Sequence, residues 1–266
     1  MLVDYLLHNI INKFSQLLYM PAGGKLTKKK GHGKGQRTGQ LFSNNHPETT
    51  VHGFGFNTPD HVDQTLAELN NRDISYQFQV VNTLNERAKS VLTRTQDPTK
   101  QSQIKRGLKL LQAWLYTYHK NNRGQTENYP YLSVQQVNKL EPLAEYYNIS
   151  RKARGLEKPS TSDEGFLVVY RRNTNPAKLR TIPVRQRVPD GETWDKHRNN
   201  FIKRRLLMLK NAGSGYGLYH TEGPLAGLPT VLHVNMLMWA FSPDKALYKG
   251  GKFTEIVKKI KSLARA

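Results

Sequence analysis

The sequence has no cysteine among its 266 residues. This absence excludes a disulfide framework, a zinc site built from thiolates, and a cysteine nucleophile. Acidic residues are also few: 20 aspartates and glutamates face 41 lysines and arginines, which gives a formal net charge of +21. Long apolar runs are missing too, and a hydrophobic fraction of 37% is too low for a protein that crosses a membrane many times.

The positive charge is divided into blocks along the chain. Residues 21–40 contain six bases and no acid, whereas residues 41–100 contain five bases and seven acids and carry a net charge of −2. Four further blocks each carry a net charge of +4 or +5: residues 101–124, 171–190, 203–210 and 251–266. A charge this large repels itself unless it meets a polyanion. Separate basic blocks predict several phosphate-contacting surfaces.

The first 20 residues predict an amphipathic helix, because their apolar residues recur at a spacing of three or four. Asp4 and His8 interrupt the apolar run, and no small-residue cleavage site follows. We therefore expect neither a secretory signal nor a membrane span, and an intracellular location. Residues 1–20 are expected to dock onto other proteins of an assembly, with binding to a membrane surface as the alternative. Met20 is an alternative start of the chain.

Residues 21–48 predict a disordered basic arm rich in glycine and lysine, because such a composition cannot bury enough apolar surface to order the chain. We expect Lys28, Lys29 and Lys30 to contact phosphates, or to act as a nuclear localisation patch. The glycine spacing does not indicate a nucleotide-binding P-loop, since no strand precedes it and no GKS or GKT sequence occurs.

Residues 49–121 predict a helical module of three amphipathic helices, over 59–70, 73–92 and 99–121. Thr58, Pro59 and Asp60 have the residue types of a helix start, and so does the Asp-Pro-Thr sequence before the third helix. The third helix carries a basic face opposite its apolar stripe, made of Lys105, Arg106, Lys109 and Gln112. This face is interpreted as a phosphate-binding surface, with a solvated lysine-rich face as the alternative.

Residues 122–164 predict linkers around one helix, over 133–148. Residues 165–250 predict a β-hairpin, with strands over 165–170 and 178–184, followed by a helix over 190–211. Basic residues at the hairpin ends and on that helix are further candidates for phosphate contacts: Arg171, Arg172, Arg180, Arg204 and Arg205.

Residues 251–266 predict a basic amphipathic C-terminal helix. The expected fold class is therefore mainly α with a small β-hairpin (α+β), in which a helical bundle module is followed by a hairpin plus basic helices.

Motifs for catalysis are absent from the sequence, and we expect no metal site and no cofactor. The nine histidines form no zinc-binding pattern, and the acidic residues are too scattered for a two-metal nuclease. Only Tyr219, His220 and Glu222 form a local cluster of catalytic residue types. Binding without catalysis is therefore the favoured interpretation, and a nuclease-like enzyme that uses this trio is an alternative.

Two patches of the chain carry a resemblance. The first comprises residues 50–56, 76–84 and 87–89, and the second comprises residues 203–205 and 233–244. Both patches resemble an uncharacterised family of basic proteins from large DNA viruses and related mobile elements. The family has no known catalytic residues to carry over to this sequence. The resemblance implies a role in genome packaging or replication.

The sequence thus predicts a nucleic-acid-binding protein that contacts the phosphate backbone largely without sequence specificity, with DNA favoured over RNA. The nucleus or a virion is the expected location. A structural component of a virion or ribonucleoprotein assembly is the alternative.

Overall fold

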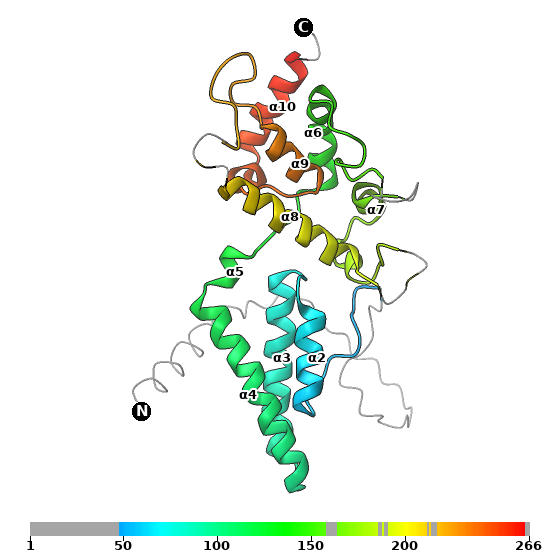
Figure 1. The fold of residues 1–266 in the computed structure, drawn as a ribbon, viewed down its shortest axis with the longest axis vertical. Coiled ribbons are helices and arrows are strands. Elements are labelled where there is room, and N and C mark those ends of the chain that lie inside the picture. Colours follow the sequence, from blue (N-terminus) through cyan, green and yellow to red (C-terminus); the bar gives the residue numbers. More distant parts are fainter. Residues whose placement is uncertain are drawn as a thin grey trace, which may run out of the picture. The chain divides into compact units, whose positions relative to one another are not determined.

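The chain is mainly helical (Figure 1). The computed structural model describes residues 48–157, 164–185, 188, 191–211, 213 and 217–263. Every described residue belongs to one compact unit, Asn44–Ala266. The predicted helix over residues 1–20 and the cluster Lys28, Lys29 and Lys30 lie outside the described residues. Within the described residues, no helix is long and apolar enough to cross a membrane.

The three helices expected after residue 58 are confirmed as α2 (Pro59–Leu69), α3 (Ile74–Leu92) and α4 (Pro98–Lys120), which lie side by side (Figure 1). Their starts follow from local chemistry. The Thr58 hydroxyl accepts a hydrogen bond from the first turn of α2, and the Asp97 carboxylate accepts two from the first turn of α4. The shared core is an apolar cluster of buried residues: Val62, Leu69, Val81, Leu84 and Leu111.

A glycine inside α4 allows this close packing. A Cβ at Gly107 would lie 3.0 Å from the carbonyl oxygen of Phe56 and 3.1 Å from Cγ2 of Val62. Glycine costs about 1 kcal/mol relative to alanine in a helix interior. Here it leaves room for α2 and for the segment that leads into it.

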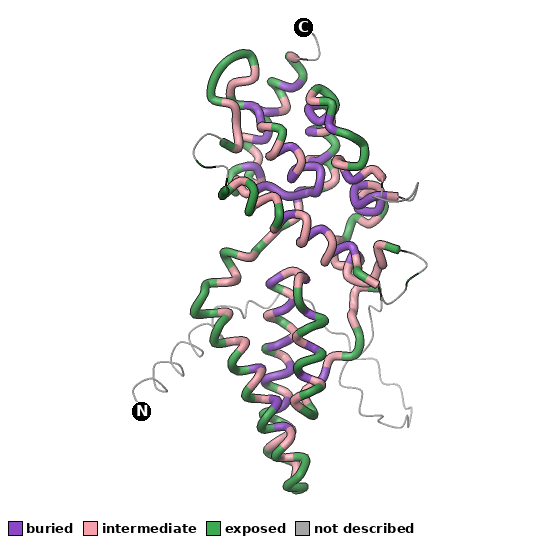
Figure 2. Tube along the Cα trace, viewed as in Figure 1, coloured by how far each residue is buried: buried purple, intermediate pink, exposed green. Residues whose placement is uncertain are grey.

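The rest of the described chain folds around a second, larger apolar cluster. Its elements include α6 (Val134–Tyr146), α8 (Trp194–Asn211), α9 (Val231–Met238), the 3-10 helix η3 (Lys245–Lys249) and α10 (Gly251–Leu263). The short helix α5 (Arg123–Thr126) instead contacts α4 and α3. Buried positions recur along α6, α9 and α10 (Figure 2). The helices predicted over 133–148, 190–211 and 251–266 correspond to α6, α8 and α10.

The predicted β-hairpin over residues 165–184 is wrong. Its first strand is the helix α7 (Phe166–Arg172), and its second strand begins inside the 3-10 helix η1 (Pro176–Arg180) and continues as irregular chain. Among the described residues, β pairing is limited to three isolated bridges. A short apolar run does not by itself distinguish a buried helix from a strand, and burial has overridden the β propensity of this segment.

Aromatic stacking and a close backbone approach fix α7. The ring of Phe166 stacks between those of Tyr170, at 5.5 Å, and Trp239, at 5.0 Å. A Cβ at Gly165 would lie 2.3 Å from the carbonyl oxygen of Gly155, so this helix start accepts only glycine. Buried neighbours thus surround this segment on several sides. A hairpin at the surface would pack against the core on one face only.

Arg198 of α8 is fully buried, although it has no carboxylate partner among the described residues. Its guanidinium donates five hydrogen bonds of 3.0–3.1 Å, to the carbonyl oxygens of Tyr129, Pro130, Trp239 and Ala240 and to the side chain of Asn199. The guanidinium carbon (Cζ) of Arg198 also lies 3.5 Å from the ring centroid of Tyr131. Because all five donors are used, this charge is compensated by carbonyl dipoles, two of them at the C-terminal end of α9.

Candidate nucleic-acid interface

One side of α4 presents basic and polar side chains to solvent. We call it the α4 cationic face, and its members are Lys105, Arg106, Lys109, Gln112, Tyr116 and Lys120, all exposed. Gly107 and Leu111 are buried on the opposite side of the same helix. The face follows from helical periodicity, since residues three, four and seven apart share one side of a helix.

The cations at the centre of this face have no acidic partner among the described residues. No ion pair joins Lys105, Arg106 or Lys109 to a described carboxylate, whereas Lys100, in the first turn of α4, lies 3.8 Å from Asp97. Their charge is therefore not neutralised within the described fold. Exposed cations of this kind can exchange their counterions for phosphates.

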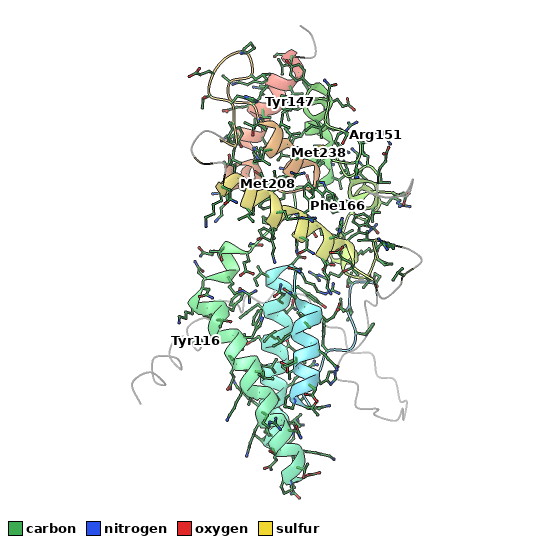
Figure 3. All side chains as sticks on the ribbon, viewed as in Figure 1. Tyr116, Tyr147, Arg151, Phe166, Met208 and Met238 are labelled. Atoms are coloured by element: carbon green, nitrogen blue, oxygen red, sulfur yellow. The ribbon has the colours of Figure 1, made fainter. Side chains whose placement is uncertain are left out.

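Tyr116 adds an aromatic surface to the cations. Its side chain is 53% exposed, and the ammonium of Lys120 lies 5.6 Å from its ring centroid. Figure 3 shows Tyr116 projecting from α4. The sequence interpretation missed both residues, although the four-residue spacing of Gln112, Tyr116 and Lys120 continues the basic face and could have revealed them.

Three of the predicted arginines are paired with acids of this chain. Arg171 binds Glu141, and Arg172 binds Glu164. These guanidinium groups can contact a phosphate only by sharing or leaving their carboxylates, which lowers their expected contribution.

Arg180 is the third paired arginine. It lies 3.8 Å from Asp73 and 4.0 Å from the ring centroid of Tyr76. Only 20% of its side chain is exposed. Arg180 therefore helps to attach η1 to the start of α3 rather than presenting a free cation.

The two predicted arginines of α8 differ in their surroundings. Arg204 is exposed, whereas the Arg205 guanidinium lies 4.9 Å from the ring centroid of Phe201 and donates to the sulfur of Met208. Burial and the neighbouring Arg204 lower the pKa of Arg205. Arg204 is thus the freer of the two cations.

The predicted catalytic trio does not form one site. The Tyr219 hydroxyl donates to Asp244 at 2.6 Å, and Lys252 binds the same carboxylate at 2.7 Å. Burial and the hydrogen bond to Asp244 raise the pKa of Tyr219, while Lys252 and Tyr219 hold the pKa of Asp244 at about 2 against the effect of its own desolvation. A neutral phenol that donates to a paired carboxylate is a structural link and a poor proton acceptor.

His220 belongs to a different hydrogen-bond pair. Its Nε2 lies 3.1 Å from the Tyr147 hydroxyl, which donates to the carbonyl oxygen of Pro229 at 2.9 Å. Burial raises the pKa of Tyr147 to about 12. Because the hydroxyl hydrogen is used on the carbonyl, Nε2 of His220 carries the other hydrogen. Glu222 is exposed, and no hydrogen bond joins it to Tyr219 or His220.

Within the described residues, no group of three or more histidine, aspartate and glutamate side chains could hold a metal ion. Comparison with protein-family models and with curated proteins found no match for the chain. The resemblance to basic viral proteins therefore stays a prediction.

Proposed function

We propose that the protein binds nucleic acid through the α4 cationic face, mainly by contacts to phosphates. The observation that supports the proposal best is the grouping of Lys105, Arg106 and Lys109, exposed and without an acidic partner among the described residues, on one side of one helix. A net charge of +21 supports the same class of partner.

The length of the face suits a polyanion. Lys105 and Lys120 lie 15 residues apart on α4, so their Cα atoms are separated by about 22 Å along the helix axis. Successive phosphates of one DNA strand advance about 3.4 Å along the duplex axis, so this length can follow several of them. A single small anion would leave most of the face unused.

The chemistry of the face favours binding without sequence specificity. Lysine makes point-charge contacts to phosphates, and only Arg106 and Gln112 have the paired donors or acceptors that read base edges. Tyr116 can stack on a base that is not paired, which favours single strands or duplex ends at that position.

Charge reversal on two exposed faces tests the proposal. Fluorescence anisotropy with labelled duplex and single-stranded DNA at low salt compares the wild type, Lys105→Glu/Lys109→Glu, and Lys258→Glu/Lys261→Glu on α10. All four lysines are exposed, so both variants make the same change in charge. We expect the α4 variant to bind at least about tenfold more weakly than the α10 variant. Equal weakening, or no binding by the wild type, contradicts the proposal.

A further inference from the structure

A second basic feature lies on α8 and shares no residue with the α4 cationic face. A pocket of about 340 Å³ is lined by Glu192, His197, Asn200, Lys203 and Arg204. We call it the α8 pocket. Four of its residues come from α8, where the spacing of His197, Asn200 and Arg204 places them on one side of the helix.

Both oxygens of the carboxylate in this pocket accept a hydrogen bond from α8. Backbone pairing positions Glu192, because its carbonyl oxygen accepts from the Val184 amide at 2.8 Å. Oε2 of Glu192 lies 2.8 Å from Nδ1 of His197, and Oε1 accepts from Asn200 at 2.9 Å. A carboxylate only accepts, so Nδ1 of His197 carries a hydrogen and Nε2 is left for a ligand.

The cations of the pocket are not neutralised by that carboxylate. Arg204 is exposed and makes no ion pair with a described residue, although it lines the same pocket as Glu192. Lys203 donates one hydrogen bond, to Oδ1 of Asn71 at 2.8 Å, and has two further donors. A second carboxylate, Glu127, acts on Lys203 from outside the lining, but it is paired with Arg123 at 2.7 Å. Two cations against one carboxylate therefore leave the lining with net positive charge even when His197 is neutral.

We propose that the α8 pocket binds a phosphate group. The Arg204 guanidinium supplies a fork of two donors, Lys203 supplies a second cation, and Nε2 of His197 supplies a donor from a third side chain when the ring is protonated. Glu192 orients His197, and its own repulsion of a phosphate is opposed by the two cations that line the same pocket. Inorganic phosphate, a small phosphate ester and the phosphorylated end of a nucleic acid share this chemistry. The proposal does not depend on the α4 cationic face.

Proton NMR of the full chain tests the site directly. The His197 ring resonance is identified as the one that His197→Gln lacks, and it is followed while inorganic phosphate replaces chloride at constant ionic strength. We expect a saturable shift in the wild type. Arg204→Ala should raise the dissociation constant at least about tenfold, the effect of losing a hydrogen bond to a charged group.

Two controls separate this site from general charge effects and from the proposed function. Lys210→Ala removes the same charge from a position on α8 outside the pocket, and we expect it to bind phosphate like the wild type. Lys105→Ala/Lys109→Ala should also leave phosphate binding unchanged. A shift that does not saturate, or equal weakening by Lys210→Ala and Arg204→Ala, overturns the proposal.

A second comparison identifies the source of the phosphate. Oligonucleotides of one sequence, with a 5′-phosphate, a 3′-phosphate or neither, are titrated into the wild type and Arg204→Ala. A preference for a phosphorylated end that Arg204→Ala loses assigns the pocket to nucleic-acid ends. A saturable response to inorganic phosphate without such a preference assigns it to a small phosphate compound. A preference that Arg204→Ala keeps contradicts the assignment of the pocket.

Discussion

Arg72 and Asp195 form a buried ion pair that joins the α2–α3 connection to the start of α8. Nη1 of Arg72 lies 3.0 Å from Oδ2 and 3.2 Å from Oδ1 of Asp195, and the two side chains are 2% and 0% exposed. Thr193 donates to the same carboxylate at 2.6 Å, and Glu68 binds Nη2 of Arg72 at 2.6 Å. Burial raises the pKa of Asp195 even beside this arginine.

Removal of one partner should therefore destabilise the protein strongly. We expect Arg72→Met to lower the free energy of unfolding by about 3–5 kcal/mol, because it leaves Asp195 buried without its counter-charge. Urea unfolding measures the change. Lys89→Met is the control, because it breaks an exposed pair with Glu86 and should cost less than about 1 kcal/mol. A similar loss of unfolding free energy in the two variants would show that the buried pair stabilises the fold no more than the exposed pair does.

The five hydrogen bonds of Arg198 predict that lysine cannot replace it. Arg198→Lys keeps the charge but loses the planar fork, so at least two of the five acceptors are left buried without a donor. We expect a loss of at least about 2 kcal/mol in the free energy of unfolding. Arg204→Lys on the exposed side of α8 should change it by less than about 0.5 kcal/mol. A tolerated Arg198→Lys contradicts this account of the core.

Buried His233 predicts a stability that falls as the pH is lowered. Its ring nitrogens form hydrogen bonds with the carbonyl oxygen of Leu218 and the hydroxyl of Ser242. Burial lowers the pKa of His233 from 6.5 to about 4. Between pH 6.5 and pH 4 the histidine therefore binds more protons in the unfolded state than in the folded state. Its contribution to the free energy of unfolding is present above pH 6.5 and is lost toward pH 4. It amounts to about 2 kcal/mol between pH 7 and pH 5.

Urea unfolding at pH 7 and pH 5 checks this dependence in the wild type and in His233→Gln. The difference between the two proteins isolates the histidine from Asp195, whose raised pKa acts with the opposite sign. We expect the wild type to lose about 2 kcal/mol more than the variant over this interval. Equal losses would show that His233 titrates normally in the folded protein.

Two glycines at helix starts predict opposite responses to alanine. Gly165→Ala places a Cβ 2.3 Å from the Gly155 carbonyl oxygen, whereas a Cβ at Gly251 meets nothing within 4 Å. We expect Gly165→Ala to lower the unfolding free energy by about 1–3 kcal/mol through overpacking, and Gly251→Ala to leave it unchanged or raise it. Thermal unfolding compares the two, and equal responses would exclude the close approach as the cause.

The sequence was enough to predict the helices whose ends and buried faces are determined by neighbouring residues in the chain. The helices α2 and α4 begin where a capping side chain and a proline coincide, and α10 follows its own apolar period. The prediction for the α7 segment fails because its neighbours, not its propensity, decide its conformation. Gly155 and Trp239 both lie outside this segment, yet they fix the helix.

The candidate site was predicted only in part, for a similar reason. Helical periodicity is enough to group Lys105, Arg106 and Lys109. The sequence could not show that Arg171 and Arg172 meet carboxylates, because Glu141 and Glu164 reach them only in the folded chain. A count of basic residues measures charge, whereas binding depends on which charges remain unpaired.

The salt dependence of DNA binding tests the central claim most directly. The logarithm of the binding constant for one duplex is measured against the logarithm of salt concentration for the wild type, Lys105→Ala/Lys109→Ala and Lys258→Ala/Lys261→Ala. If the α4 cationic face binds phosphates, its variant should reduce the magnitude of the slope by about two, one unit for each phosphate that a lysine no longer neutralises, and the α10 variant should not. Identical slopes for the wild type and the α4 variant would contradict the account.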